Sequence, residues 1–99
     1  MTLPPEALRA GREALAKVDE ALAARPKKDD YVLSDATQAV CACRDALAAQ
    51  GIDGAAARDR LETLNAVLAV VLGVHFPIGP PLWEDLEKAR GWLAGLLEG

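Results

Sequence analysis

The side chain with the most versatile chemistry in this chain is His75, the single histidine. An imidazole acts as a general acid, a general base or a metal ligand when a carboxylate, a thiol or a second ligand orients it. The neighbouring residues from Val74 to Pro77 supply no such group. We therefore expect His75 to be a structural residue, packed at the end of a helix and favoured there by the helix dipole.

The two cysteines, Cys41 and Cys43, form a Cys-x-Cys pair. Two residues apart on a helix, their side chains point about 200° away from each other, which disfavours a mutual disulfide or a shared metal ion. A zinc site would also need His75 to converge with them from a separate helix. We therefore expect no metal site, and we expect Cys43 to lie on the apolar face of its helix with Cys41 turned away.

No other residues form a recognisable catalytic pattern. The sole serine, Ser34, has no histidine or lysine at a spacing typical of an activated nucleophile. The chain has no Glu-x-x-His sequence, and its apolar faces carry no carboxylate, so a di-metal carboxylate bundle is unsupported. The sequence thus predicts a non-enzymatic protein without catalytic residues and without a cofactor.

The elements that carry these side chains are predicted by apolar residues that recur at alternating steps of three and four. Such spacing places each set on one face of an α-helix, whereas a strand would divide it between two faces. Four sets occur, and they predict an all-α fold, an antiparallel up-down-up-down four-helix bundle in a single domain over residues 1–99. The four sets are Leu8, Gly11, Leu15, Val18 and Leu22; Leu33, Ala36, Val40, Cys43 and Leu47; Ala57, Leu61, Leu64, Leu68, Val71 and His75; and Leu82, Leu86, Ala89, Leu93 and Leu96.

Helix boundaries can be predicted from prolines and capping residues. Pro4 and Pro5 should open the first helix, and Pro26 should close it. Asp29 or Asp30 is expected to cap the second helix, with Ser34 as a later alternative.

The second and third helices should be joined by a short turn. The sequence Gln50-Gly51-Ile52 resembles a Schellman ending in which Gly51 adopts the left-handed conformation, and Asp53 is expected to cap the third helix. Because this connection is so short, the two helices should lie antiparallel.

Composition excludes two classes of partner. The 15 acidic and 11 basic residues are interspersed and give a net charge of -4, so the basic stripe that nucleic-acid binding requires is missing. The most apolar run, residues 66–74, is far shorter than the roughly 20 residues of a membrane span.

The N-terminal sequence shows no signal peptide, so we expect a cytoplasmic protein.

The predicted third helix carries more apolar surface than one core requires. Its apolar arc runs from Val70 to Leu72 and is about 200° wide, whereas a core-facing stripe needs little more than 100°. The following segment, residues 75–83, is apolar and contains three prolines. Two interpretations remain open: this segment folds over the helix and completes the core, or it forms with the valine face a patch for another chain.

Asn65 interrupts the same apolar stretch. It is either a boundary residue half in water or a buried polar group that fixes helix register or binds a ligand.

These observations favour a protein-interaction or self-association module, with a homodimer or another protein as the partner. The alternative is a bundle that holds a small apolar ligand between helices, because small alanine and valine side chains dominate the expected core. The residues expected to bind a partner are Val67, Val70, Val74, Phe76, Ile78 and Trp83.

Overall fold

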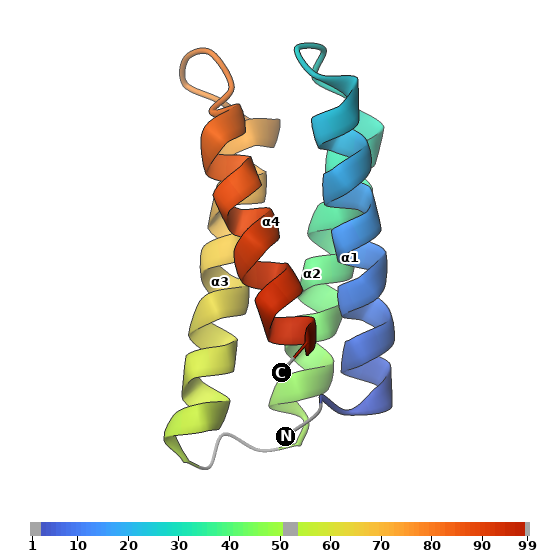
Figure 1. The fold of residues 1–99 in the computed structure, drawn as a ribbon, viewed down its shortest axis with the longest axis vertical. Helices are drawn as coiled ribbons and strands as arrows, with labels where there is room; N and C mark the ends of the chain where they lie inside the picture. The colour runs from blue at the N-terminus through green and yellow to red at the C-terminus, as the bar shows by residue number, and fades with distance from the viewer. Residues whose placement is uncertain (1–2, 51–53, 99) are drawn as a thin grey trace.

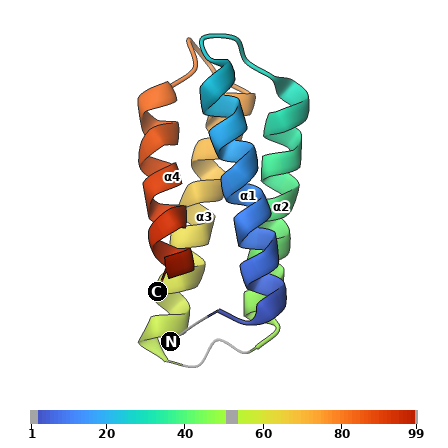
Figure 2. The same ribbon diagram turned by 45° about the vertical axis from the view of Figure 1, so that its right-hand side comes forward.

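The computed structural model describes residues 3–50 and 54–98 and folds them into four α-helices. These are α1 (Pro5–Ala24), α2 (Asp30–Ala48), α3 (Ala55–His75) and α4 (Trp83–Glu98), and the described ranges contain no strand. Figures 1 and 2 show the helices side by side, each running opposite to the one before it. The predicted four-helix bundle is confirmed.

The predicted signals at the first two helices are also confirmed. Pro5 is the first residue of α1, and α1 ends at Ala24, shortly before Pro26. Asp29 caps α2, since its Oδ1 accepts the backbone N–H groups of Tyr31 at 3.1 Å and Val32 at 3.2 Å. These bonds satisfy donors that have no partner within the helix.

The connection between α2 and α3 is described only at its edges. Gly54 precedes α3 with a φ of 92°, a backbone conformation that residues other than glycine rarely adopt. The Schellman ending predicted at Gly51 and Ile52, and the cap predicted at Asp53, lie outside the described residues.

Each helix packs against two neighbours. α1 contacts α2 and α4, and α3 contacts the same two helices from the diagonally opposite corner. Residue pairs along α1 and α4 confirm that these two helices are antiparallel: Gly11 lies beside Leu97, and Asp19 pairs with Arg90.

One cluster of small and medium-sized apolar residues fills the centre. On α2 the predicted face is confirmed in full, because all five of its residues are buried. On α4 the buried residues are Leu86, Ala89 and Leu93, as predicted, whereas Leu82 precedes the helix and is exposed. These two helices therefore follow the sequence pattern closely.

The buried face of α1 differs from the predicted one by one position. Its buried residues include alanines at positions 7, 14 and 21, and the leucines at positions 8, 15 and 22 are only half-buried at the margin. Both stripes contain Gly11 and Val18 and obey the same spacing. Alanine at the centre allows α1 to approach its neighbours closely, and the leucines then cover the sides of the core.

The buried face of α3 consists of Leu64, Val67, Val71 and Val74. Leu64 and Val71 belong to the predicted face, whereas its other members Leu61 and Leu68 are half-buried at the margin. This corrects the expectation that Val67 and Val74 are surplus to the core. Their exposed fractions of 0% and 1% place them at its centre.

Candidate functional site

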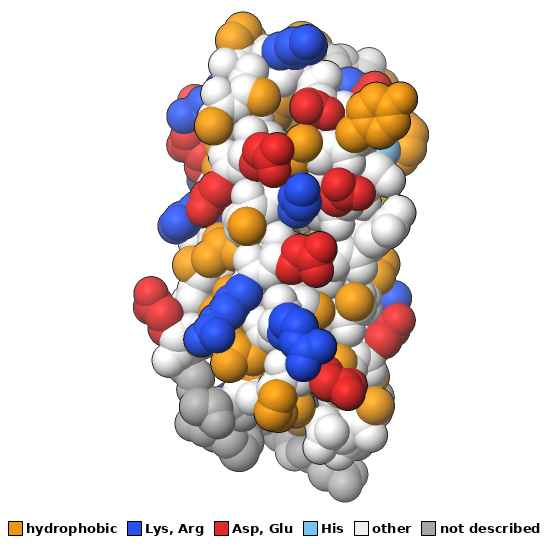
Figure 3. Space-filling view, turned by 90° about the vertical axis from the view of Figure 1, so that its right-hand side faces the viewer, with side chains coloured by type: hydrophobic (Ala, Val, Ile, Leu, Met, Phe, Trp, Pro, Cys, Tyr) orange, Lys and Arg blue, Asp and Glu red, His pale blue; other side chains and the backbone are white. Residues whose placement is uncertain are grey.

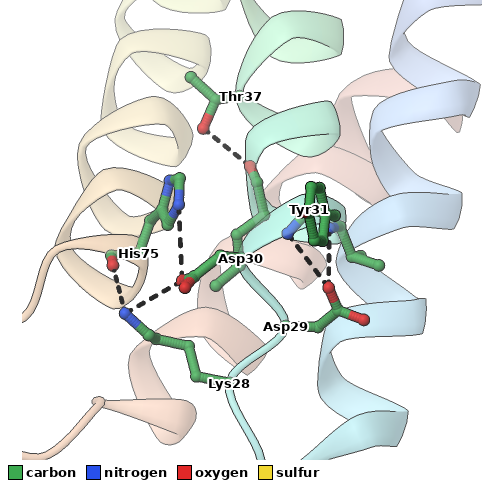
Figure 4. Close-up of polar contacts among 8 residues, drawn as sticks. Lys28, Asp29, Asp30, Tyr31, Thr37 and His75 are labelled. Carbon is green, nitrogen blue, oxygen red and sulfur yellow. Dashed lines mark hydrogen bonds and ion pairs between the residues drawn. The ribbon is translucent and has the colours of Figure 1, made fainter.

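His75 lies in a polar cluster that joins the end of α3 to the start of α2 (Figure 4). Its Nε2 is 3.6 Å from Oδ1 of Asp30, and its ring stacks on Phe76 with a centroid distance of 4.1 Å. Lys28 lies 3.1 Å from the same Asp30 oxygen and donates a hydrogen bond of 2.7 Å to the carbonyl oxygen of His75. The carboxylate that orients His75 thus comes from another helix, where the local sequence could not reveal it.

This cluster is suited to structural work. A cation at the C-terminal end of a helix is favoured by the helix dipole, and Lys28 satisfies a carbonyl that has no partner within α3. Acid-base catalysis would need a nucleophile or a substrate pocket beside the ring. The ring of His75 contacts Asp30 and Phe76, its carbonyl oxygen accepts a hydrogen bond from Lys28, and it lines none of the three hollows described below. The expected structural role of His75 agrees with this geometry.

The thiols are separated as their spacing indicates. Cys43 is buried, and burial raises the pKa of its thiol to about 11. Cys41 is half-buried on another side of α2, and both cysteines are free thiols. Within residues 3–50 and 54–98, no group of three or more His, Cys, Asp or Glu side chains is arranged to hold a metal ion.

The segment between α3 and α4 does not fold over α3. Figure 1 shows it as a loop that projects beyond the helix ends. Phe76 is 69% exposed, Ile78 is fully exposed, and Leu82 is 63% exposed. Of the two interpretations of this segment, completion of the core is therefore wrong.

Three hollows follow one another along the outer side of α3 and α4. The first, of about 510 Å³, lies between Asp59, Glu62, Thr63 and Ala66 of α3 and Trp92 of α4. The second, of about 250 Å³, is lined by Ala69, Val70, Gly73, Val74, Leu82 and Asp85. The third, of about 420 Å³, lies at the loop and shares Gly73 and Leu82 with the second.

These hollows form what we call the α3–α4 groove. Its floor on α3 is made of small residues, Ala66, Ala69 and Gly73, at steps of three and four along one side of the helix. A Cβ atom added to Gly73 would have no atom within 4 Å. The short side chains of this floor therefore leave open space on the α3 side of the groove.

The groove carries three acidic side chains: Asp59, Glu62 and Asp85. Among the described residues, no lysine or arginine lines any of the three hollows. Within the described part of the chain, none of the three carboxylates forms an ion pair, and no ion pair joins α3 to α4.

On the other side of α4 from the groove, the contact between α1 and α4, which we call the α1–α4 seam, is closed by ion pairs and by packing. Arg90 donates to Asp19 at 2.7 Å, and Arg25 pairs with Glu87. On the neighbouring α1–α2 side, positive and negative side chains alternate with hydrophobic ones (Figure 3).

The structure separates the residues predicted to bind a partner. Val67 and Val74 lie in the core, Val70 and Trp83 are half-buried against it, and Phe76 and Ile78 are exposed. Sequence reasoning did not select Leu82 or Trp92, which are exposed, or the acidic residues of the groove. An apolar position outside the helical stripe was the only available signal for Trp92. Asn65 is exposed, which agrees with a boundary residue.

Comparison with known proteins gives no match to a family model, a curated protein or a solved structure. None of the helices, as far as they are described, has the length and apolar character needed to cross a membrane.

Proposed function

We propose that this protein is a non-enzymatic interaction module that docks another protein chain on its α3–α4 side. The observation that carries the proposal is the distribution of exposed apolar side chains. Among the described residues there are six large exposed hydrophobic side chains, and five belong to α3, α4 or the loop between them: Leu72, Phe76, Ile78, Leu82 and Trp92.

The type of surface supports a protein partner over a small ligand. A pocket for a small molecule encloses most of its ligand, whereas the hollows of the α3–α4 groove lie in a row on the outside of the bundle. An exposed tryptophan such as Trp92 is typical of the residues that dominate the binding energy of a protein interface. Binding of a small apolar ligand between the helices stays the alternative.

A homodimer is one form of this function, confined to the loop between α3 and α4. Two copies related by a twofold axis would bury Phe76 and Ile78 against each other. Sedimentation equilibrium over a range of concentrations tests this form, and a constant monomer mass would contradict it. We further expect the module to work in the cytoplasm.

The proposal is tested by selecting helical peptides from a random library against the wild-type protein. We expect the selected peptides to bind at least about tenfold more weakly to a Leu82→Asp variant, because a charge would enter the apolar contact. Tyr31→Asp is the matched control, since Tyr31 is the remaining large exposed hydrophobic residue among those described and lies on α2. Selected peptides that respond equally to both substitutions, or no selected peptide at all, would contradict the proposal.

A further inference from the structure

Resting on the proposed docking function, we propose that the occupant of the α3–α4 groove is a cationic amphipathic helix from a different protein. Its apolar face would contact Leu82, Trp92 and the small residues of the groove floor. Its lysine or arginine side chains would meet Asp59, Glu62 and Asp85.

Charge complementarity carries the choice of a cationic partner. The three carboxylates border the hollows and form no ion pair within the described structure, and no lysine or arginine is among the described residues that line the hollows with them. A docked cation would gain Coulomb energy without first breaking an internal ion pair. Trp92, 46% exposed beside Asp59 and Glu62, adds an aromatic face that attracts ammonium and guanidinium groups.

The shape of the groove favours a helix. Hollows lined by residues from Asp59 to Phe76 extend over 17 residue steps of α3 and its end, a length of roughly 26 Å at 1.5 Å per step. A helix of about the same number of residues would match this length, and its side chains would enter the hollows at steps of three and four. The small floor residues allow its backbone to come close, as the open space beside Gly73 shows.

A second copy of this chain fits the groove less well. Each copy carries a net charge of -4, so two copies repel each other at long range, whereas a cationic partner is attracted. The carboxylates at the groove would also remain unpaired unless the second copy presented a basic helix face. Self-association is accordingly an outcome that contradicts this inference when it occupies the groove.

The experiment uses a fluorescein-labelled model peptide of leucine and lysine, about 16 residues long, whose sequence forms an amphipathic helix. One control peptide has glutamate in place of every lysine, and a second has the same composition in a scrambled order. Binding is measured by anisotropy with the full chain and, in a Trp83→Phe background, by the fluorescence of Trp92. We expect the lysine peptide to bind, both control peptides to bind at least about tenfold more weakly, and Trp92 emission to change.

Protein variants then locate the charge effect. The triple variant D59N/E62Q/D85N should bind the lysine peptide about tenfold more weakly, whereas E6Q/E13Q/E20Q, which removes three charges from the diagonally opposite α1, should change affinity by less than about twofold. Equal weakening in both triple variants would overturn the inference, because it would show attraction to net charge alone. Self-association that is abolished by D59N/E62Q/D85N would also overturn it.

The proposed function and this inference fail in different ways. If the lysine peptide does not bind but peptides of other charge are selected and depend on Leu82, the cationic helix is wrong and the docking function stands. If no peptide of any charge depends on Leu82, both are wrong.

Discussion

The two seams that α4 makes with its neighbours differ in almost every respect. Against α1, Leu97 fills the space beside Gly11, and ion pairs such as that between Asp19 and Arg90 cross the seam. Against α3, short side chains leave a row of hollows, and the carboxylates beside them are unpaired in the described structure. One helix therefore has a closed seam and an open seam on its two sides.

This difference shows how a small bundle can complete its core and still leave apolar side chains exposed on one side. The buried residues form one cluster from all four helices, so α3 is held through Leu64, Val67, Val71 and Val74 whether or not its outer side is covered. The exposed apolar residues on that side are additional to the core. A contact surface beside a complete core can change its occupancy without unfolding the protein.

The largest expected effect is a difference in stability between a substitution in the buried face of α3 and one at the edge of the groove. Val67→Glu places a charge in the fully buried core and should lower the free energy of unfolding by about 4 kcal/mol or more. Val70→Glu, at the half-buried edge of a hollow, should cost only about 1 kcal/mol because its carboxylate can reach water. Urea unfolding followed by circular dichroism measures both, and equal costs would contradict the proposed division of α3.

Replacement of a glycine by leucine should have opposite effects on the stability of the fold at the two seams. A Cβ at Gly11 would lie 2.5 Å from Cδ2 of Leu97, so Gly11→Leu should overpack the closed seam and destabilise the fold by about 1–3 kcal/mol.

Gly73→Leu enters open space and replaces a poor helix former, so it should stabilise the fold by about 0.5–1 kcal/mol. Thermal unfolding of the two variants gives the comparison. A loss of stability at Gly73 as large as that at Gly11 would mean that the groove is filled in solution.

Sequence patterns predicted the helices and most of their boundaries because prolines, the Asp29 cap and the apolar spacing act locally. They predicted the α2 face correctly but misplaced the α1 face by one position, since two adjacent stripes that share Gly11 and Val18 satisfy the spacing equally well. The choice between them depends on how closely neighbouring helices approach. That distance is a property of the assembled bundle.

The same limitation explains the candidate site. The wide apolar arc on α3 suggested surplus apolar surface, but Val67, Val71 and Val74 within it are buried in the core. The groove lies on another side of the helix, where Ala66, Ala69 and Gly73 line it. The pairing of His75 with Asp30 joins residues from two helices and therefore has no signature in local sequence.

The smallest expected effect concerns the two thiols and leaves the fold unchanged. Thiol reagents react with the thiolate, and burial raises the pKa of Cys43 from 9.0 to about 11, so Cys43 should be labelled much more slowly than Cys41 at pH 8. In urea the two rates should become equal. Rapid, equal labelling in the native state would contradict the burial of Cys43 in the core.

The shift also has a consequence for stability. The pKa of the Cys43 thiol is higher in the folded protein than in the unfolded chain. The stability that the protonated thiol contributes to the fold is therefore fully present below pH 9 and is lost as the pH rises toward 11. The decrease in unfolding midpoint over this range should be smaller in a Cys43→Ala variant.

The central claim, that the open seam is the docking side, is tested most directly by amide-resolved NMR of the protein titrated with a peptide selected from the random library. We expect the largest chemical-shift changes at backbone amides from Asp59 to Gly73, at residues 76–85, and at the indole N–H of Trp92. Amides of α1, on the diagonally opposite corner, should change little. Shifts concentrated on α1 and α2, with Trp92 unaffected, would contradict the account.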